Sequence, residues 1–288
     1  MLIWNQDQDS REYIKRRWTP RPGHADYSAH VKYGGYNDFR GGGRFSGRIT
    51  ASYVMAGALT KKLLKKTMNV EVIAHTKQIG SIVAENRETE EILRNKEQNP
   101  VRTGDLHAAP IMAEAIENAS KEGDSLGGTV ECFIMNLPAG IGEPVFNSFE
   151  GVLSNALFSI PAVKSVEFGL GKKLSTRKGT ESNDSFIIKD EKITVKTNRG
   201  GGILGGISIG SLVFFTVNFK PTPSINKLQN TVDLRSLKET TISVSGRHDP
   251  CIVPRAVPVV EAIASFVTAD LSVQSGHIPR TLKESKSN

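Results

Sequence analysis

The chain has 288 residues, of which 38% are hydrophobic, so it is long enough to bury a sizeable core in one large domain or two smaller ones. No uninterrupted apolar run approaches the roughly 20 residues that a membrane-spanning helix needs, and the start lacks the pattern of a signal peptide, so we expect a cytoplasmic protein. With 37 Lys and Arg against 30 Asp and Glu, the net charge of +7 favours an anionic partner, but it does not choose among nucleic acid, a phosphorylated metabolite and a membrane surface.

Residues 1–45 are rich in Gly, Arg, Tyr and Asp and show no sustained helical or strand period. We expect an irregular loop region here that carries functional residues. The rest of the chain is more regular. Apolar residues at helical spacing predict helices at 46–64, 107–120, 148–158 and 254–271, the second of them capped by Asp105.

Short β-branched segments predict strands between these helices. They lie at 70–80, 127–135, 161–169, 211–219 and 240–246, with a hairpin at 185–197. Because strands and helices do not alternate regularly, the pattern predicts an α+β fold with antiparallel sheets rather than a doubly wound parallel sheet. We expect one domain at 1–274 and a flexible polar tail at 275–288.

The first segment with chemical potential is Arg21-Pro-Gly-His24-Ala-Asp26. Proline and glycine favour a tight turn that displays an arginine, an imidazole and a carboxylate within a few residues. Because the unperturbed pKa of histidine lies near neutrality, His24 beside Asp26 is a candidate proton donor or acceptor. A purely structural histidine explains the pattern equally well.

The second segment is Arg40-Gly-Gly-Gly-Arg44-Phe45-Ser46-Gly-Arg48, which leads directly into the first predicted helix. Glycines let backbone N–H groups approach an anion, and the helix start and arginine forks add positive charge. We therefore expect a phosphate or carboxylate ligand. The alternative is a flexible nucleic-acid-binding segment of the RGG type, although such segments are usually long and repetitive.

The third segment runs over 198–210 and is rich in glycine, and 220–225 (KPTPSI) follows after one predicted strand. These two loops therefore lie at opposite ends of that strand. So many glycines, with Ile and Leu between them, suit a flat ring or a phosphate that approaches bare backbone. The segment lacks the strand–turn–helix context of a dinucleotide fingerprint, so contact with some other cofactor is expected.

The fourth segment is Gly246-Arg247-His248-Asp249-Pro250-Cys251. Proline restricts Asp249 to extended geometry, so its carboxylate is a candidate base, and Arg247 and Arg255 are candidate anion ligands. A salt-bridged turn is the structural alternative. Cys251 and Cys132 have no Cys or His at metal-ligand spacing, so we expect buried thiols and neither a disulfide nor a metal site.

Six motifs of the sequence, in this order, resemble chorismate synthase, most closely its archaeal-type form. They are RPGHADY, YGGYNDFRGGGRFSGR, SIPAVKSVEFG, GGGILGGISIG, KPTPSI and GRHDPCIVPRAVPVVEA. The resemblance covers nearly the whole chain. It implies a homotetramer of subunits built as a β-α-β sandwich, with helices between two antiparallel sheets. It also implies a carbon–oxygen lyase of the shikimate pathway of aromatic amino-acid biosynthesis. That enzyme converts 5-enolpyruvylshikimate 3-phosphate to chorismate by an anti-1,4-elimination of phosphate and requires reduced FMN.

The resemblance also assigns roles to individual residues. It implies that His24 protonates the reduced flavin and that Asp249 helps to remove the substrate proton. Arg21, Arg48 and Arg255 would bind substrate phosphate and carboxylates. The implied cofactor-binding residues are Arg44, Phe45, Ser46, Pro161, Ala162, Gly205, Lys220, Pro221, Thr222, Pro223, Ser224 and Arg247. The sequence leaves open whether a separate reductase or an intrinsic NADPH-dependent activity reduces the flavin.

Some features depart from the family pattern. Phe45 stands where the family usually has a serine, and its ring is expected to narrow the flavin pocket. The GESHG motif and arginine-rich stretch with which the family begins are not found in the 288 residues, so Met1 falls where the family is already mid-strand. We therefore expect a chain that lacks the N-terminal segment and is an inactive fragment. From other classes, the alternatives are a basic nucleic-acid-binding protein, which predicts steep salt dependence of binding, and a flavin oxidoreductase.

Overall fold

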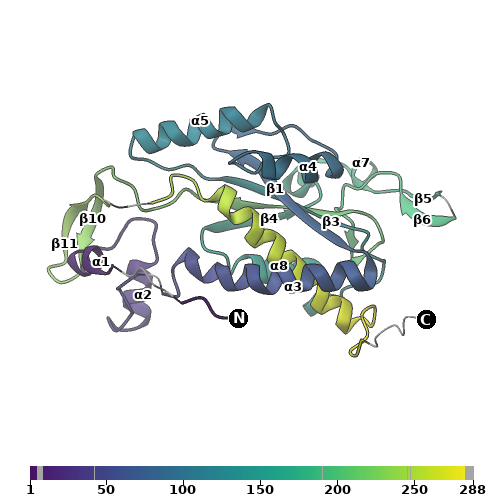
Figure 1. Ribbon diagram of the computed structural model, residues 1–288, viewed down its shortest axis with the longest axis horizontal. Helices are drawn as coiled ribbons and strands as arrows, with labels where there is room; N and C mark the ends of the chain where they lie inside the picture. The colour runs from purple at the N-terminus through teal and green to yellow at the C-terminus, as the bar shows by residue number, and fades with distance from the viewer. Residues whose placement is uncertain (5–8, 42, 190, 245, 247, 283–288) are drawn as a thin grey trace.

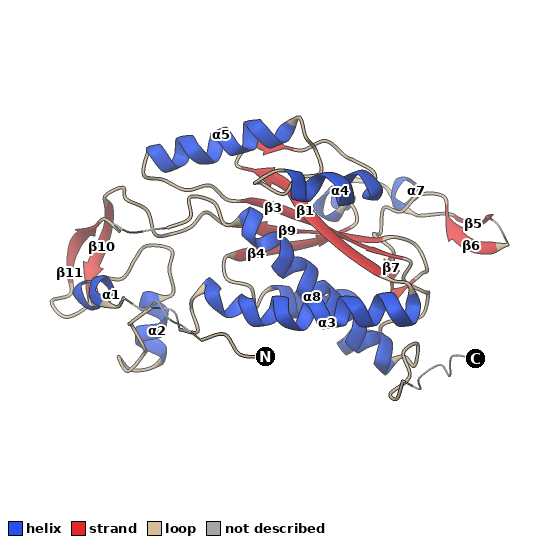
Figure 2. Cartoon of the chain, in the orientation of Figure 1, coloured by secondary structure: helices blue, strands red, loops and turns tan. Residues whose placement is uncertain are grey.

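The computed structural model describes residues 1–4, 9–41, 43–189, 191–244, 246 and 248–282. Its principal element is a five-stranded sheet in which all neighbouring strands are antiparallel (Figures 1 and 2). The order across the sheet is β2 (Ile82–Val83), β1 (Glu71–Ile79), β3 (Gly128–Met135), β9 (Val213–Phe219) and β4 (Val163–Phe168). Separate hairpins join β5 (Phe186–Lys189) to β6 (Lys192–Val195), β7 (Ile203–Leu204) to β8 (Ile207–Ser208), and β10 (Gln229–Asp233) to β11 (Lys238–Ile242).

One face of the large sheet is apolar and forms the core. Every second residue of β9 is buried, as expected for a strand with one face on the core: Val213, Phe215, Val217 and Phe219. Cys132 of β3 lies opposite Phe215, and Ala74 of β1 lies opposite Cys132. These side chains therefore share one face and join one hydrophobic cluster. Cys132 and Cys251 are both buried free thiols, as predicted.

Three helices cover this face: α3 (Thr50–Met68), α6 (Phe149–Leu157) and α8 (Val253–Gln274). α3 and α8 cross in direct contact (Figure 1), because a Cβ added to Gly57 would lie only 2.3 Å from that of Ala262. By length and composition α8 is apolar enough to span a membrane, but 78% of its most apolar window is buried inside the protein. It is the central helix of the core.

Two further helices, α4 (Thr89–Asn95) and α5 (Ala108–Lys121), contact β1, and α5 also contacts β2. The residue directly before α5 is His107, which makes no side-chain cap. The predicted cap Asp105 accepts hydrogen bonds from the backbone N–H of His107 (3.0 Å) and of Ala108 (3.4 Å) and so caps the turn that leads into the helix. A short helix, α7 (Gly179–Ser182), precedes β5. The long predicted helices and most of the predicted strands are therefore found within a few residues of their expected positions.

The N-terminal region is more regular than its sequence indicates. It contains α1 (Arg11–Lys15) and α2 (Asp26–Lys32), where we expected only irregular loop. α1 buries no residue and α2 buries only Ala29, so neither leaves an apolar period in the sequence. Together with β10 and β11 they form a lobe beside the sheet (Figure 1). Backbone contacts hold this lobe together, since Leu234 donates its N–H to the carbonyl of Trp18 (2.9 Å).

Two other expectations are met only in part. Among the described residues, α3, α6 and α8 cover one face of one large sheet and no second large sheet lies on their other side, because the remaining strands have two to five residues each and pair only as hairpins. The α+β class and antiparallel pairing are confirmed, whereas the full β-α-β sandwich stays a prediction. The ordered fold also continues past 274, since Ile278 is buried in the core cluster. Residues 283–288 of the expected tail lie outside the described residues.

A buried charge cluster links α8 to the edge of the sheet. Glu261 of α8 accepts a hydrogen bond from the backbone N–H of Ala74 in β1 (2.7 Å). The same carboxylate pairs with Lys61 of α3 (2.8 Å) and with the buried Lys96. Glu261 and Lys96 are each only 6% exposed, so neither charge is stable here without the other.

We expect Glu261→Gln to lower the free energy of unfolding by about 3–5 kcal/mol, because it leaves the ammonium of Lys96 buried without a carboxylate. Urea denaturation followed by circular dichroism measures the change. The control is Glu71→Gln, which breaks an exposed pair with Lys65 and should cost no more than about 1 kcal/mol. Equal losses in the two variants would show that the cluster does not hold the fold.

The same cluster predicts a dependence on pH. Burial raises the pKa of Glu261, but Lys96 and Lys61 outweigh burial and leave the pKa below its ordinary value of 4.5. A depressed carboxyl pKa contributes stability that is present above the unfolded-state value and is lost as the pH falls through the folded-state value. The difference in unfolding free energy between wild type and Glu261→Gln should therefore be full near neutral pH and shrink below pH 4.5. A difference that stays constant from neutral to acid pH would contradict this assignment.

Candidate active site

The turn at 21–26 brings its three functional side chains together. The Arg21 guanidinium donates to both carboxylate oxygens of Asp26, from Nε (2.8 Å) and Nη2 (2.9 Å). His24 Nδ1 lies 2.7 Å from Asp26 Oδ1, and Arg21 Nη2 also contacts the imidazole. Burial raises the pKa of the Asp26 carboxyl, but the hydrogen bonds from Arg21 and His24 outweigh it and hold the pKa far below its ordinary value. Asp26 is therefore a fixed anion that orients the ring of His24.

This turn packs on the loop that follows β9. Arg21 Nη1 donates to the hydroxyl of Ser224 (3.0 Å), and the ammonium of Lys220 bonds the carbonyl of Gly23. The backbone N–H of Lys220 in turn donates to the carbonyl of Ala162 (3.0 Å), a residue held at a φ of 74°. Motifs separated by about 140 or 200 residues thus form one cluster, which holds His24 beside the predicted cofactor residues 161–162 and 220–224.

The polar groups of this cluster are suited to an anionic ligand. Burial, and then the neighbouring Lys164, lower the pKa of Lys220 from its ordinary value. The hydroxyl oxygen of Thr222 is buried and has no hydrogen-bond partner among the described residues. Buried polar groups are normally paired, so an unpaired hydroxyl two residues along the loop from a partly desolvated cation is a position for a ligand oxygen.

Tyr13 joins the glycine-rich loop to this cluster, and sequence reasoning missed it. A Cβ on Gly41 would lie 2.5 Å from the Tyr13 ring, so only glycine allows the loop backbone to approach so closely. The guanidinium carbon of Arg21 lies 5.9 Å from the centre of the same ring. Because α1 has no buried residue and no apolar period, its sequence gave no sign that Tyr13 occupies this position.

The rest of the glycine-rich loop leaves its predicted ligands exposed. Ser46 accepts the N–H of Arg48 (3.2 Å) and so caps the short helical turn at 47–49. Arg44 and Arg48 are exposed, and neither forms an ion pair within the described part of the chain. Phe45 is 40% exposed and does not fill a core position. The loop thus offers two unpaired guanidinium groups at the start of α3.

The segment before α8 lies at the same end of the sheet. Leu126 donates its N–H to the carbonyl of Pro250 (2.7 Å), and the adjacent Ser125 hydroxyl donates to the carbonyl of Thr222 (2.7 Å). Asp249 forms an ion pair with Arg255 (2.9 Å), so the salt-bridged turn that we considered as an alternative is present. The Arg255 side chain is 77% exposed, which leaves this pair open to a ligand. Arg247 lies outside the described residues.

Comparisons with known proteins show the family to which this chain belongs. A family model described as chorismate synthase matches residues 1–273. A chorismate synthase of Dehalococcoides mccartyi is 52% identical over 284 residues, which are 99% of this chain and 78% of the relative. One from Pyrococcus abyssi is 50% identical over 94% of this chain and 75% of its own length. A solved structure titled "Crystal Structure of Chorismate Synthase" aligns with a TM-score of 0.70 and 26% identity, over 86% of this chain and 69% of that one. This chain belongs to the chorismate synthase family.

The family assigns the chain the function of a chorismate synthase, a lyase of the shikimate pathway of aromatic amino-acid biosynthesis. It accounts for the six motifs at once, and it leaves the nucleic-acid-binding alternative without support. Chorismate synthases use reduced FMN, and a flavin with its phosphate fits the cations and the unpaired Thr222 hydroxyl described above.

One predicted cofactor residue lies away from this cluster. Gly205 is in the turn between β7 and β8, next to Gly206, whose carbonyl accepts the N–H of Phe149 (2.9 Å). That hairpin precedes β9, whereas Lys220 follows it, so the seven residues of β9 separate the two by roughly 20 Å. Figure 2 shows β7 and the α1–β10 lobe beyond opposite ends of the sheet. Within one chain, the structure therefore does not bring Gly205 to the other predicted chorismate synthase residues.

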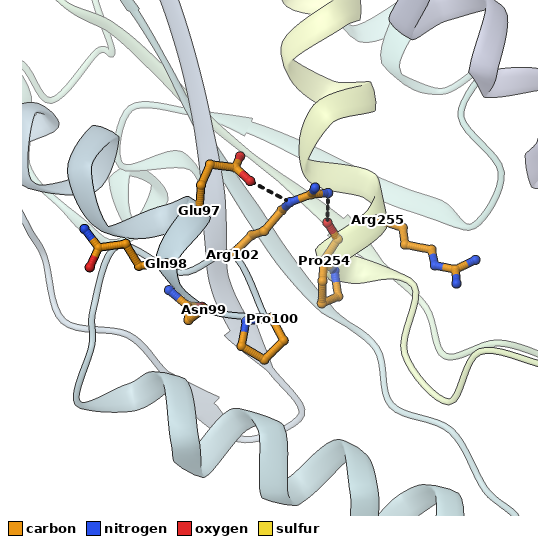
Figure 3. A pocket seen from close by; sticks show the side chains of 7 residues that line it. All are labelled: Glu97, Gln98, Asn99, Pro100, Arg102, Pro254 and Arg255. Carbon is orange, nitrogen blue, oxygen red and sulfur yellow. Dashed lines mark hydrogen bonds and ion pairs between the residues drawn. The ribbon is translucent and has the colours of Figure 1, made fainter.

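An open cleft of about 500 Å³ adjoins the start of α8 (Figure 3). Arg102 closes one side, since it donates to Glu97 (3.3 Å) and to the carbonyl of Pro254 (3.2 Å). Arg255 lines the cleft but points away from Arg102 in Figure 3. Neither His24 nor residues 220–224 are among its lining residues, so only one edge of the cleft coincides with the predicted chorismate synthase site.

The pairing of Arg21 with Asp26 gives a test of this arrangement. We expect Asp26→Asn to lower the free energy of unfolding by about 2 kcal/mol, because a guanidinium that is only 9% exposed loses its charged acceptor. The matched control is Asp38→Asn, which breaks an exposed pair with Arg40 and should change stability by less than about 1 kcal/mol. Both are measured by urea denaturation at neutral pH. An Asp26→Asn variant as stable as Asp38→Asn would show that the Arg21–Asp26 pair does not stabilise the turn.

Proposed function

We propose that the cluster around His24 and residues 220–224 catalyses the anti-1,4-elimination of phosphate from 5-enolpyruvylshikimate 3-phosphate, with reduced FMN bound beside the substrate. The observation that supports it best is the packing of the His24 turn on the loop after β9 through Arg21 and Lys220. This contact joins the predicted proton donor to the predicted cofactor loop. An alternative in which His24 is only structural does not explain why a polar turn and an unpaired buried hydroxyl meet at one place.

The cofactor would be held by backbone and cations on two sides. Residues 161–162 and 220–224 would supply one wall, with Lys220 and Thr222 directed to anionic or carbonyl oxygens, and the loop from Arg44 to Ser46 would supply the other. When bound, the reduced flavin supplies transient electron density for loss of the phosphate. The protein's own task is to hold the two rings in position, exclude water and neutralise the departing charge.

Two residues would handle protons. Asp26 and Arg21 fix the ring of His24, so that a proton held on its imidazole faces the bound flavin. Asp249, which helps to remove the proton of the substrate, is at present paired with Arg255. In this scheme Arg255 turns to a carboxylate or phosphate of the substrate, and the carboxylate of Asp249 becomes free to act as a base. Arg48, which is exposed, would bind a second anionic group.

The assembly and the location of the enzyme belong to this proposal. If Gly205 contacts the same flavin as Lys220, it does so from a neighbouring subunit, because β9 separates the two within one chain. That agrees with the homotetramer that the sequence motifs imply. We also place the protein in the cytoplasm, where either a separate reductase or NADPH acting at the protein itself would reduce the flavin.

Anaerobic turnover with chemically reduced FMN tests the proposal. The sequence led us to expect an inactive fragment, but the match to a chorismate synthase over 99% of this chain favours activity, so wild type should release phosphate and form chorismate. His24→Ala and Asp249→Asn should each lower kcat by about 10²–10⁴-fold, the usual contribution of a positioned acid or base. Binding of FMN, measured by fluorescence quenching, should persist in both variants. The control His277→Ala changes an exposed histidine whose imidazole is hydrogen-bonded to Ser275, and it should keep the wild-type rate. Wild type that binds FMN but never releases phosphate would refute the proposal.

A further inference from the structure

Arg21, one of three arginines predicted to bind substrate, is engaged by the protein at all three guanidinium nitrogens. Its Nε and Nη2 bond Asp26, its Nη1 bonds Ser224, and Nη2 also reaches His24. The side chain is only 9% exposed. These contacts use four of its five N–H groups, and burial leaves little access to the fifth, on Nη1. Arg21 is therefore better suited to positioning His24 than to binding the substrate.

Arg16 lies beside this network and has the opposite properties. Its guanidinium carbon is 4.8 Å from the centre of the Tyr13 ring, the same ring that Arg21 approaches. Its Nε is buried without a hydrogen-bond partner among the described residues, and it forms no ion pair with a described carboxylate. Burial, and then the charge of Arg21, lower the pKa of Arg16 from its ordinary value, and the charges of Tyr13, Asp26 and Glu12 offset this only in part. A partly buried cation next to a second cation is unfavourable unless an anion is also present.

The position of Arg16 in the site indicates which ligand would supply this anion. Gly41 packs against Tyr13 and leads to the exposed Arg44 and Arg48, so Arg16 stands between the glycine-rich loop and the His24 turn. A guanidinium binds phosphate and carboxylate groups through paired N–H donors. Stacking on Tyr13 restricts the side chain, so that less entropy is lost when an anion binds.

We infer that Arg16 binds a phosphate or carboxylate group of the substrate beside Arg21. This inference rests on the proposed function, because that function names the anionic substrate. It adds a substrate-binding residue that lies outside all six motifs. Arg17 offers a matched control, since it follows directly in the chain and stacks on Trp18 (4.7 Å) and Phe39 (4.3 Å), away from Tyr13.

The first experiment uses inorganic phosphate as the probe and thermal unfolding of the full chain as the readout. Phosphate that binds the folded state should raise the Tm of wild type. Arg16→Gln should lose most of this rise, Arg16→Lys should keep part of it, and Arg17→Gln should keep all of it. If phosphate raises the Tm of Arg16→Gln as much as that of wild type, the anion does not bind at Arg16 and the inference is wrong.

The second experiment identifies the source of the anion by titration calorimetry without turnover. Arg16→Gln should bind 5-enolpyruvylshikimate 3-phosphate at least about tenfold more weakly than wild type, as expected for loss of one charge-assisted contact, while FMN affinity stays within about twofold. If Arg16→Gln weakens the binding of FMN and leaves that of the substrate unchanged, Arg16 binds the cofactor phosphate and the substrate assignment is wrong. If the binding of inorganic phosphate requires Arg16 but wild type never turns over the substrate, the anion site is supported and the proposed function is wrong.

Discussion

The arrangement of the whole molecule depends on how the outer edge of β1 is covered. Beyond its two paired residues with β2, β1 has no strand from the described residues on that side, and exposed backbone groups of a buried strand must find other partners. The Glu261 carboxylate accepts the N–H of Ala74, Lys96 donates to the carbonyl of Ala74 (3.3 Å), and Arg102 accepts the N–H of Thr76 through its carbonyl (2.8 Å). Side chains and a loop thus replace a strand, and they attach α8 to the sheet.

This attachment determines where the functional residues lie. Arg102 also donates to the carbonyl of Pro254, so the loop that covers β1 fixes the first turn of α8 and with it Arg255, which pairs with Asp249 just upstream of the helix. The other loops of the site follow β9 and precede β3 and β4, the two strands that are hydrogen-bonded to β9 on either side. Antiparallel pairing brings the end of one strand beside the start of the next, so the loops at this edge are held together by the rigid sheet below them.

The sequence predicted the parts of this structure that have a local pattern and missed those that depend on distant contacts. The long helix α8 and the alternating strand β9 follow directly from apolar periodicity. Glu261 appears in that pattern only as a polar position in an apolar helix, because its partner Lys96 is 165 residues away. The site shows the same division. The motifs located His24 and residues 220–224, but Tyr13 lies in, and Arg16 directly follows, a helix too short and too exposed to leave a signal.

The distribution of charge in the site explains why its unpaired groups are cations. Asp26 neutralises Arg21, and no described carboxylate pairs with Arg16, Arg44 or Arg48, while Lys220 lies near Lys164. Each unpaired cation lowers the stability of its neighbours in the free protein, and each strengthens the attraction for a ligand with several negative charges. The excess of seven positive charges is therefore partly a property of the site, where the ligand and not the protein supplies the neutralising anions. A site of this kind binds its anions at the cost of its own stability when empty, so ligand binding and the folding of the N-terminal lobe are energetically coupled.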